Sequence, residues 1–526
     1  MLARMIAAIT LMMTPVPAAA APIAVDGGRI DGVVLPSGVR AWLGVPFAAP
    51  PLRDLRWKPP QPVTPWRGVL HADRFAPECL QPLRGSMQNH YFGNEATSED
   101  CLYLNIWAPT KPGAKPGAKL PVLVWIYGGG FTIGSASMAN YSGEPLARAG
   151  VIRVNLAYRV GSLGFFAHPD LSRESGYGAS GNYGLMDQIA ALQWVRRNIA
   201  RFGGDPANVT IAGQSAGSFS VALLQSSPLA KGLFARALGM SGSPFDGMLG
   251  PTPLAKAEAE GVAMQKQWGA GSLAQLRAMP GDRVIAGATA HMPIVLDGHV
   301  LNDTPAAVFA THQQNDVPVL IGYTRDEAFR PLGPVVSADD LHAAVTARFP
   351  DRAAAILAAY GDVAPARAAA DIGRDSGAGT EMAQWALAQA QGGHAPVYAY
   401  QFTRRQPYAP GIAFSDHDPA TAGAYHTGDV PYWLRTRASL NLFRQTRVWQ
   451  PVDQTLETEM SDALLAFVRR GRPSGPTIGA WPAFDPARPR LVRLGEDSAV
   501  IDWPHFADMP LLARSAVPVP ANRPRD

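Results

Sequence analysis

Apolar runs alternate with segments of helical spacing through the first half of the chain. Residues 120–127 are almost all apolar and lead into three glycines, and residues 151–158 form a second apolar run. Residues 187–202 differ, because their apolar side chains recur every three or four positions, at Ile189, Leu192, Val195, Ile199 and Phe202. Continuous apolar runs are typical of strands buried on both faces, whereas the second spacing is typical of an amphipathic helix. The pattern therefore predicts two buried strands followed by a helix.

The same alternation continues toward the C-terminus. Further strands are predicted at residues 208–213, 235–240, 317–322 and 396–402, and helices at 216–225 and 452–470. Strands that alternate with helices favour an α/β fold with a mainly parallel sheet covered on both faces. The chain shows no internal repeat, and its Pro/Gly/Lys segment at 111–119 is most simply an exposed loop. We expect one domain over residues 21–526, with inserted helical segments.

The first 20 residues have the order of a cleavable signal peptide. Arg4 supplies a positive charge, residues 5–13 are apolar but too short to span a bilayer, and Ala18 to Ala20 follow two prolines. Cleavage is expected after Ala20. No later stretch is long and apolar enough for a transmembrane helix, so the sequence predicts an exported protein without a membrane anchor.

Composition narrows the possible partners. Hydrophobic residues make up 47% of the 526 residues and charged residues 17%, which is typical of a globular protein. The 46 Lys and Arg against 42 Asp and Glu give a net charge of +4. That excess is too small to indicate a nucleic-acid partner. Oligomeric state cannot be inferred from these numbers.

The chain has two cysteines, Cys79 and Cys101. In an oxidising compartment such a pair can form a disulfide, and closing the loop between them would stabilise the fold by about 3 kcal/mol. Two buried free thiols are the alternative. Without a nearby pair of histidines the cysteines make a poor zinc site, so no metal is expected.

Residues 213–217 read Gly-Gln-Ser-Ala-Gly, which fits the G-x-S-x-G pattern. The pattern alone is weak, but here a predicted strand precedes it and a predicted helix follows it, as in a nucleophile elbow. We therefore expect Ser215 to be a nucleophile presented above the sheet edge. A serine in an ordinary turn is the alternative.

Gly128, Gly129 and Gly130 directly follow the predicted strand at 120–127. Acyl transfer requires fixed N–H donors where the carbonyl oxygen becomes negative, and glycines let a backbone approach the substrate closely. We expect donors from Gly129 and Gly130, with a third from Ala216. A phosphate-binding loop is disfavoured because the G-x-x-x-x-G-K-[ST] spacing is missing. A purely structural turn is the other alternative.

A serine nucleophile needs a general base and an orienting carboxylate. The pattern favours His426, which lies in a glycine-flanked loop, and His417 comes second among five histidines at a useful distance after Ser215: His342, His394, His417, His426 and His505. For the acid, Asp326 and Glu327 lie just beyond a predicted strand, where catalytic groups collect in parallel sheets. Spacing does not choose between these two carboxylates.

Several motifs together resemble the type-B carboxylesterase/cholinesterase family over residues 22–512. The resemblance is carried by residues 202–217, 99–105 and 125–131, by Tyr158-Arg159 with Gly164-Phe165, and by residues 182–185. It implies the α/β-hydrolase fold, hydrolysis of small carboxyl esters, and no cofactor or metal. It also implies Glu327 as the acid, His426 as the base, and a disulfide between Cys79 and Cys101.

Two departures from the family bear on the substrate. Most members have Glu where this chain has Gln214, and the segment between the cysteines contains Tyr91 and Phe92 but lacks the Trp with which cholinesterases bind choline. We therefore expect neutral or bulky esters as substrates rather than choline esters. The candidates for the substrate pocket are Gln214, Phe131, Phe245 and Met292.

Overall fold

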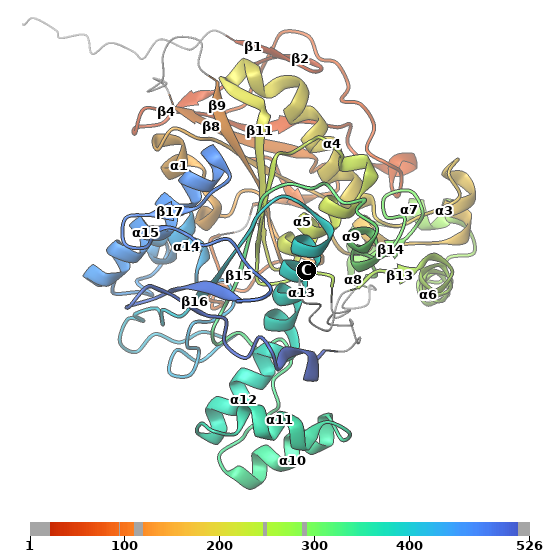
Figure 1. The fold of residues 1–526 in the computed structure, drawn as a ribbon. Coiled ribbons are helices and arrows are strands. Elements are labelled where there is room, and N and C mark those ends of the chain that lie inside the picture. The colour runs from red at the N-terminus through yellow and green to blue at the C-terminus, as the bar shows by residue number, and fades with distance from the viewer. Residues whose placement is uncertain (1–21, 94, 110–118, 246–249, 287–291, 514–526) are drawn as a thin grey trace, which may run out of the picture.

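The computed structural model describes residues 22–93, 95–109, 119–245, 250–286 and 292–513 (Figure 1). The predicted signal peptide at residues 1–20 and most of the predicted loop at 111–119 lie outside these ranges. No helix in the described part of the chain is both long and apolar enough to cross a membrane.

An eleven-stranded sheet forms the centre of the described structure. Its strands, in spatial order, are β20 (Ala499–Asp502), β19 (Arg490–Leu494), β16 (Val397–Phe402), β15 (Val319–Thr324), β12 (Arg236–Met240), β11 (Gly204–Gln214), β9 (Leu120–Ile126), β10 (Ile152–Leu156), β8 (Tyr103–Pro109), β4 (Val39–Pro46) and β3 (Val33–Val34). Pairing is parallel from β19 through β10 and antiparallel at both edges.

The central strands are buried along their length. Every residue of β10, β15 and β16 is buried, as the apolar runs predicted. Because these strands are parallel and in register, with Gly213 beside Ile126 and Gly239, their carboxyl ends meet at one side of the sheet. We call this side the carboxyl edge.

Helices cover both faces of the sheet (Figure 1). On one side lie α1 (Glu144–Arg148), α14 (Val430–Trp433) and α15 (Pro451–Arg470), and on the other α4 (Tyr183–Asn198), α5 (Ala216–Ser226) and α9 (Pro305–Ala310). A capping box between Gln450 and Asp453 starts α15, and Gly471 ends it with a φ of 74°.

The remaining helices and strands complete the described structure. The helices are α2 (Gly161–Phe165), α3 (Pro169–Glu174), α6 (Leu254–Gln267), α7 (Leu273–Ala278), α8 (Gly281–Ala286) and α13 (Thr380–Gly392). Small separate sheets are formed by β1 (Ile23–Val25), β2 (Gly28–Asp31) and β5 (Val69–His71), by β6 (Glu78–Cys79) with β7 (Thr97–Ser98), by β13 (Thr252–Pro253) with β14 (Val295–Leu296), and by β17 (Ser474–Gly475) with β18 (Gly479–Ala480).

Three helices protrude at one end of the molecule: α10 (Ala338–Arg348), α11 (Ala353–Tyr360) and α12 (Pro365–Arg374) (Figure 1). They enclose an apolar cluster of their own, built around Val345, Ile356 and Ile372. This insertion follows β15 and precedes β16, so it interrupts the α/β alternation.

One predicted boundary that differs from the structure is the start of α4. The helix begins at Tyr183, not at residue 187, because Asn182 adopts a φ of 55° and starts it. The Asn182 side chain is fixed by hydrogen bonds to the backbone of Val295, a residue far away in the chain. Such a long-range contact leaves no local signal in the sequence.

Candidate active site

Ser215 lies in a sharp turn between β11 and α5, at the carboxyl edge. Its φ of 57° and ψ of −127° are unusual for a residue with a side chain. The turn is held by its backbone, since Ser215 N–H donates to Met240 O at 2.8 Å and Ser215 O accepts from the N–H groups of Ser218 and Phe219.

The glycines of the motif allow the strand and helix to approach each other. A Cβ on Gly213 would lie 2.3 Å from Gly217 O, and one on Gly217 would lie 2.1 Å from Ile126 O. Any larger residue at either position would therefore push the Ser215 turn away from the sheet.

The run from Gly128 to Gly130 lies against the same turn. A Cβ on Gly128 would lie 2.4 Å from Gln214 O and 2.9 Å from the Ser215 Cβ. Gly129 and Gly130 have φ values of 119° and 62°, in the region that favours glycine. Ala216 is the first residue of α5, where backbone N–H groups have no partner within the helix. Both groups of candidate donors thus border Ser215.

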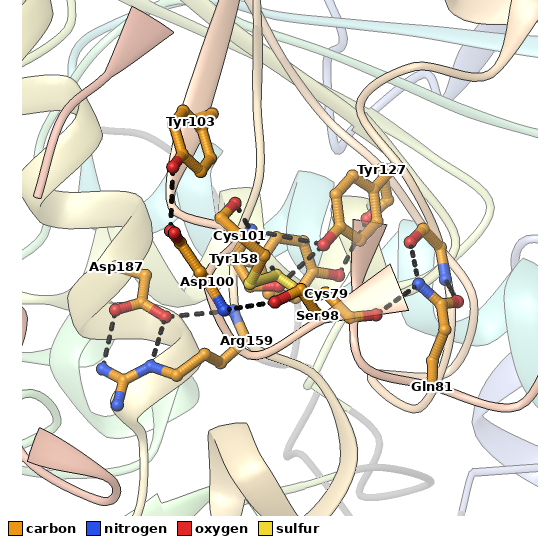
Figure 2. Close-up of a disulfide and its surroundings, with 11 residues drawn as sticks. Cys79, Gln81, Ser98, Asp100, Cys101, Tyr103, Tyr127, Tyr158, Arg159 and Asp187 are labelled. Atoms are coloured by element: carbon orange, nitrogen blue, oxygen red, sulfur yellow. Dashed lines mark hydrogen bonds and ion pairs between the residues drawn. A yellow bond between two sulfur atoms is a disulfide. The ribbon is translucent and has the colours of Figure 1, made fainter. Parts of the chain in front are cut away.

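Next to this loop is a disulfide between Cys79 and Cys101, the pairing that the resemblance implied (Figure 2). Gln81, two residues beyond Cys79, donates to Gly134 O and accepts from Gly134 N–H, both at 2.7 Å. Tyr127 stacks on Tyr158, and each hydroxyl donates to the other residue's carbonyl. These contacts hold both ends of the glycine loop.

His426 comes from the long loop between β16 and α14 and contacts Glu327 from the loop after β15. The distance from His426 Nδ1 to Glu327 Oε2 is 2.5 Å. Glu327 is 3% exposed, and its other oxygen accepts from Thr324 N–H at 2.9 Å. The ring of Phe329 meets the imidazole edge-on, with centroids 4.7 Å apart. The buried carboxylate therefore fixes one side of the ring.

Gln214 contacts both nitrogens of the imidazole, at 3.4 Å from Nδ1 and closer to Nε2. Its side-chain nitrogen is 3.0 Å from His426 Nε2, and the residue is 1% exposed. The short contact between Nδ1 and the Glu327 carboxylate fits the tautomer in which Nδ1 carries the proton. This is the tautomer that leaves Nε2 free of a proton, as a general base requires.

Asp326 does not share the surroundings of Glu327. Its oxygens accept from Arg325, from Arg367 at 2.6 Å and from Ala424 N–H at 2.7 Å. These donors lower its pKa against the opposing effect of burial. Asp326 therefore serves as an ion-paired anchor for the loop that carries His426.

The other candidate histidines lie elsewhere. His417 bonds to Tyr408 and stacks between Phe414 and Tyr425, and His505 stacks on Tyr360. His342 and His394 are exposed, on α10 and in a turn respectively. Of the five, His426 is the one that contacts Glu327.

The four pocket candidates are buried in different surroundings. Phe131 has a φ of 60° and packs edge-on against Phe165. Phe245 packs on Phe309 and Trp385, and Met292 belongs to the main core. Gln214 is the one with a contact to His426. His291, next to Met292, falls in a stretch that the structure does not describe.

Sequence reasoning missed a buried carboxyl close to the site. Asp429 is fully buried and accepts from the Tyr400 hydroxyl at 2.6 Å. Burial, together with the nearby charge of Glu327, raises its pKa to about 6. The only sequence signal was its position three residues after His426, which says nothing about burial.

Within the described residues, no group of three or more His, Cys, Asp or Glu side chains is arranged to hold a metal ion. The chemistry that the site offers is that of the serine turn, the imidazole, the buried carboxylate and the glycine loop. Together they suit attack on a carbonyl carbon.

Comparisons with known proteins identify the family of the chain. The model of the carboxylesterase family matches residues 19–354 and 362–505. Fumonisin B1 esterase of Sphingopyxis macrogoltabida is 38% identical over 479 residues, which is 88% of this chain and 84% of that protein. Phenmedipham hydrolase of Pseudarthrobacter oxydans is 31% identical over 91% of this chain and 96% of its own length.

Among solved structures, a PNB esterase superposes with a TM-score of 0.78 at 29% identity and covers 94% of this chain and 99% of its own. The fold is therefore the α/β-hydrolase fold, as the resemblance implied. A match over most of the chain, together with relatives above 30% identity, shows the family. The chain belongs to the carboxylesterase family, and it is a carboxylic ester hydrolase.

Proposed function

We propose that this protein hydrolyses carboxyl esters through an acyl-enzyme on Ser215, with His426 as general base and Glu327 as the orienting acid. The observation that carries the proposal is the 2.5 Å contact between His426 and a buried Glu327, at the edge where Ser215 stands in its sharp turn. Such a relay of three side chains is what a weakly nucleophilic hydroxyl needs.

In the proposed cycle His426 Nε2 takes the Ser215 proton as the oxygen attacks the ester carbonyl. Glu327 accepts the Nδ1–H hydrogen bond and stabilises the imidazolium that forms. The N–H groups of Gly129, Gly130 and Ala216 bind the oxyanion. His426 then protonates the departing alcohol, and water attacks the acyl-enzyme by the same route in reverse.

Gln214 leaves the Nε2 lone pair open to the Ser215 hydroxyl, because its amide nitrogen lies within 3.4 Å of both ring nitrogens and so sits to the side of that lone pair. We infer that substrate binding orders the Ser215 hydroxyl against His426 Nε2. Hydrogen bonds of this kind often form only in the complex with substrate.

The substrates we propose are neutral or bulky esters rather than choline esters. Gln214 places no negative charge beside His426, and Tyr91 and Phe92 stand in the disulfide loop where a choline-binding Trp is absent. The relatives named for fumonisin B1 and for phenmedipham show that different members act on different compounds, so a panel of esters is needed to find the natural one.

We also propose export after signal-peptide cleavage near Ala20. The disulfide in the structure supports an oxidising compartment. The mass of the N-terminal peptide of protein recovered outside the cytoplasm tests this, and a peptide that still contains residues 1–20 would contradict it.

The test of the mechanism is Ser215→Ala. We expect kcat to fall roughly 10⁵- to 10⁶-fold, and covalent labelling by a fluorophosphonate to disappear, with the fold intact. Ser226→Ala on the same helix is the matched control, since Ser226 bonds only to the carbonyl of Ala222 one turn earlier. Turnover near the normal rate in Ser215→Ala would refute the assignment.

A further inference from the structure

The loop that carries His426 has little regular structure of its own. Residues 403–429 form no helix or strand, apart from an isolated bridge at Tyr408. The direction of the imidazole therefore depends on side-chain contacts that reach this loop from elsewhere. Glu327 and Gln214 hold the ring itself, which leaves the question of what holds the backbone beneath it.

The backbone conformation is unfavourable at Thr427, the residue after His426. Thr427 has a φ of 74°, in the left-handed region that a β-branched side chain rarely adopts. Gly428 N–H donates to Tyr425 O at 2.8 Å, so His426 and Thr427 occupy the middle of a tight turn. A strained conformation persists only where its neighbours determine it.

His90 provides such a contact from the disulfide loop. Its Nε2 lies 2.5 Å from Thr427 Oγ1. Its ring packs against Phe92 and Tyr425, with centroids 6.5 and 5.9 Å away. His90 is far from Thr427 in the sequence, but the Cys79–Cys101 disulfide closes the loop on which it lies. The two loops also meet where Asn89 N–H donates to Asp416 Oδ1 and Ser415 N–H donates to Met87 O, and the His90 contact is the one that reaches the turn at Thr427.

The neighbours of His90 favour one direction for this hydrogen bond. Arg447 can only donate, and its Nη2 donates to Asn89 Oδ1 at 2.6 Å. The amide nitrogen of Asn89 must then face the other way, and it lies 3.4 Å from His90 Nε2. We infer that Nε2 carries no proton and that its single lone pair accepts from the much closer Thr427 hydroxyl.

The His90 ring stays uncharged over the neutral pH range, so its Nε2 can still accept a hydrogen bond. Burial of its ring lowers its pKa to about 4, an effect that Arg447, His417 and His426 reinforce and Asp416 opposes. The imidazole is therefore neutral wherever a general-base histidine works, and its Nε2 lone pair stays available to Thr427.

We propose that His90 is a positioning residue for His426: by accepting the Thr427 hydroxyl, it holds the left-handed turn that aims the imidazole at Ser215. The proposal rests on the proposed function, because it assumes that His426 is the base. In this proposal His90 takes no part in the reaction itself: its hydrogen bond acts on Thr427, and its ring packs on Tyr425, the residue before His426.

The test uses paired variants of the full-length protein with a neutral ester. His90→Phe keeps the ring shape without the acceptor, and Thr427→Val keeps the branched shape without the hydroxyl. Each is expected to lower kcat about 10- to 100-fold while KM changes less than about twofold, because misplacing a catalytic group by about 1 Å costs this much. His90→Gln and Thr427→Ser, which retain an acceptor and a hydroxyl, should recover most of the rate.

The double variant His90→Phe with Thr427→Val shows whether the two single variants lose activity through one shared hydrogen bond or through two independent defects. If the residues act through one hydrogen bond, the double variant is no slower than the slower single variant. Losses that multiply would overturn the proposal, and so would a normal kcat in either single variant. If His90→Phe fails to fold, Thr427→Val and its rescue by Thr427→Ser give the same decision.

Two further variants complete the design. His417→Phe alters the same aromatic cluster without reaching Thr427, so its kcat should stay within about threefold of the wild type. A loss equal to that of His90→Phe would point to general packing and overturn the proposal. His426→Ala is the reference for the base. If His426→Ala keeps its activity, the proposed function itself is wrong. If His426→Ala loses its activity while His90→Phe has a normal kcat, only the positioning role is refuted.

Discussion

At the scale of single residues, the site contains two adjacent carboxylates that have different partners. Glu327 is buried against His426, whereas Asp326 pairs with Arg325 and Arg367. The sequence placed both at the end of one strand but could not choose between them. The deciding partner of Asp326, Arg367, comes from the helical insertion, and only the family resemblance pointed to Glu327.

We predict opposite outcomes for the two positions. Glu327→Gln keeps the shape but removes the charge that stabilises the imidazolium, so kcat should fall roughly 10³- to 10⁴-fold with little loss of stability. Asp326→Asn should change kcat less than about tenfold and instead lower the melting temperature, because it weakens the anchor to Arg367. Steady-state kinetics and thermal unfolding of both variants check this. The reverse ranking of kcat would show that Asp326 is the acid.

A second prediction concerns Asp429, whose pKa is raised from 3.8 to about 6. A carboxyl with a raised pKa in the folded state binds protons more tightly there than in the unfolded chain. Its stabilising contribution is thus present below about pH 4 and is lost as the pH rises through about 6. Asp429→Asn removes this titration, so the variant should gain stability relative to the wild type, by up to about 3 kcal/mol, between pH 4 and pH 7.

Denaturant unfolding of both proteins at pH 4.5 and pH 7.5 measures the difference. The asparagine oxygen can still accept from Tyr400, so the hydrogen bond is retained. An equal difference in unfolding free energy at the two pH values would contradict the predicted titration of Asp429.

At the scale of elements, the central strands were predictable and their edges were not. The runs at 120–127 and 151–158 became β9 and β10, because strands buried on both faces are apolar throughout. The antiparallel strands β4 and β8 went unpredicted, as did the insertion α10 to α12, whose apolar residues face a small separate core. The contact between His90 and Thr427 was equally hidden, because it needs two distant loops to converge.

Removing the disulfide that closes the loop between Cys79 and Cys101 should have a large effect on stability. Replacing both Cys79 and Cys101 by Ala frees a loop with a sequence separation of 22, which should lower the free energy of unfolding by about 3 kcal/mol. Gln81 and His90 lie on this loop, so kcat should fall as well. A reductant should lower the stability of the wild type and leave the double variant unchanged. Equal sensitivity of both proteins to the reductant would contradict this account.

At the scale of the whole molecule, we expect charge to influence which ester substrates the site attracts. The chain carries a net charge of +4, with 46 basic and 42 acidic residues, so no general negative field draws a cation in. Locally, the residue beside the nucleophile is the neutral Gln214, 3.0 Å from His426. Long-range and local charge thus agree in disfavouring a quaternary ammonium substrate.

We therefore predict that kcat/KM for a choline ester is lower than for a neutral ester with the same acyl group. Gln214→Glu should raise the ratio of choline to neutral ester roughly fivefold, because a pair of opposite unit charges about 4 Å apart in water is worth about 1 kcal/mol. Gln61→Glu is the matched control: it adds the same charge at an exposed position, so it tests the net charge alone and should leave the ratio unchanged. If both variants raise the ratio equally, the overall field selects the substrate and the local role of Gln214 is refuted. A wild type that already prefers the choline ester would refute the assignment of neutral substrates, whatever the variants do.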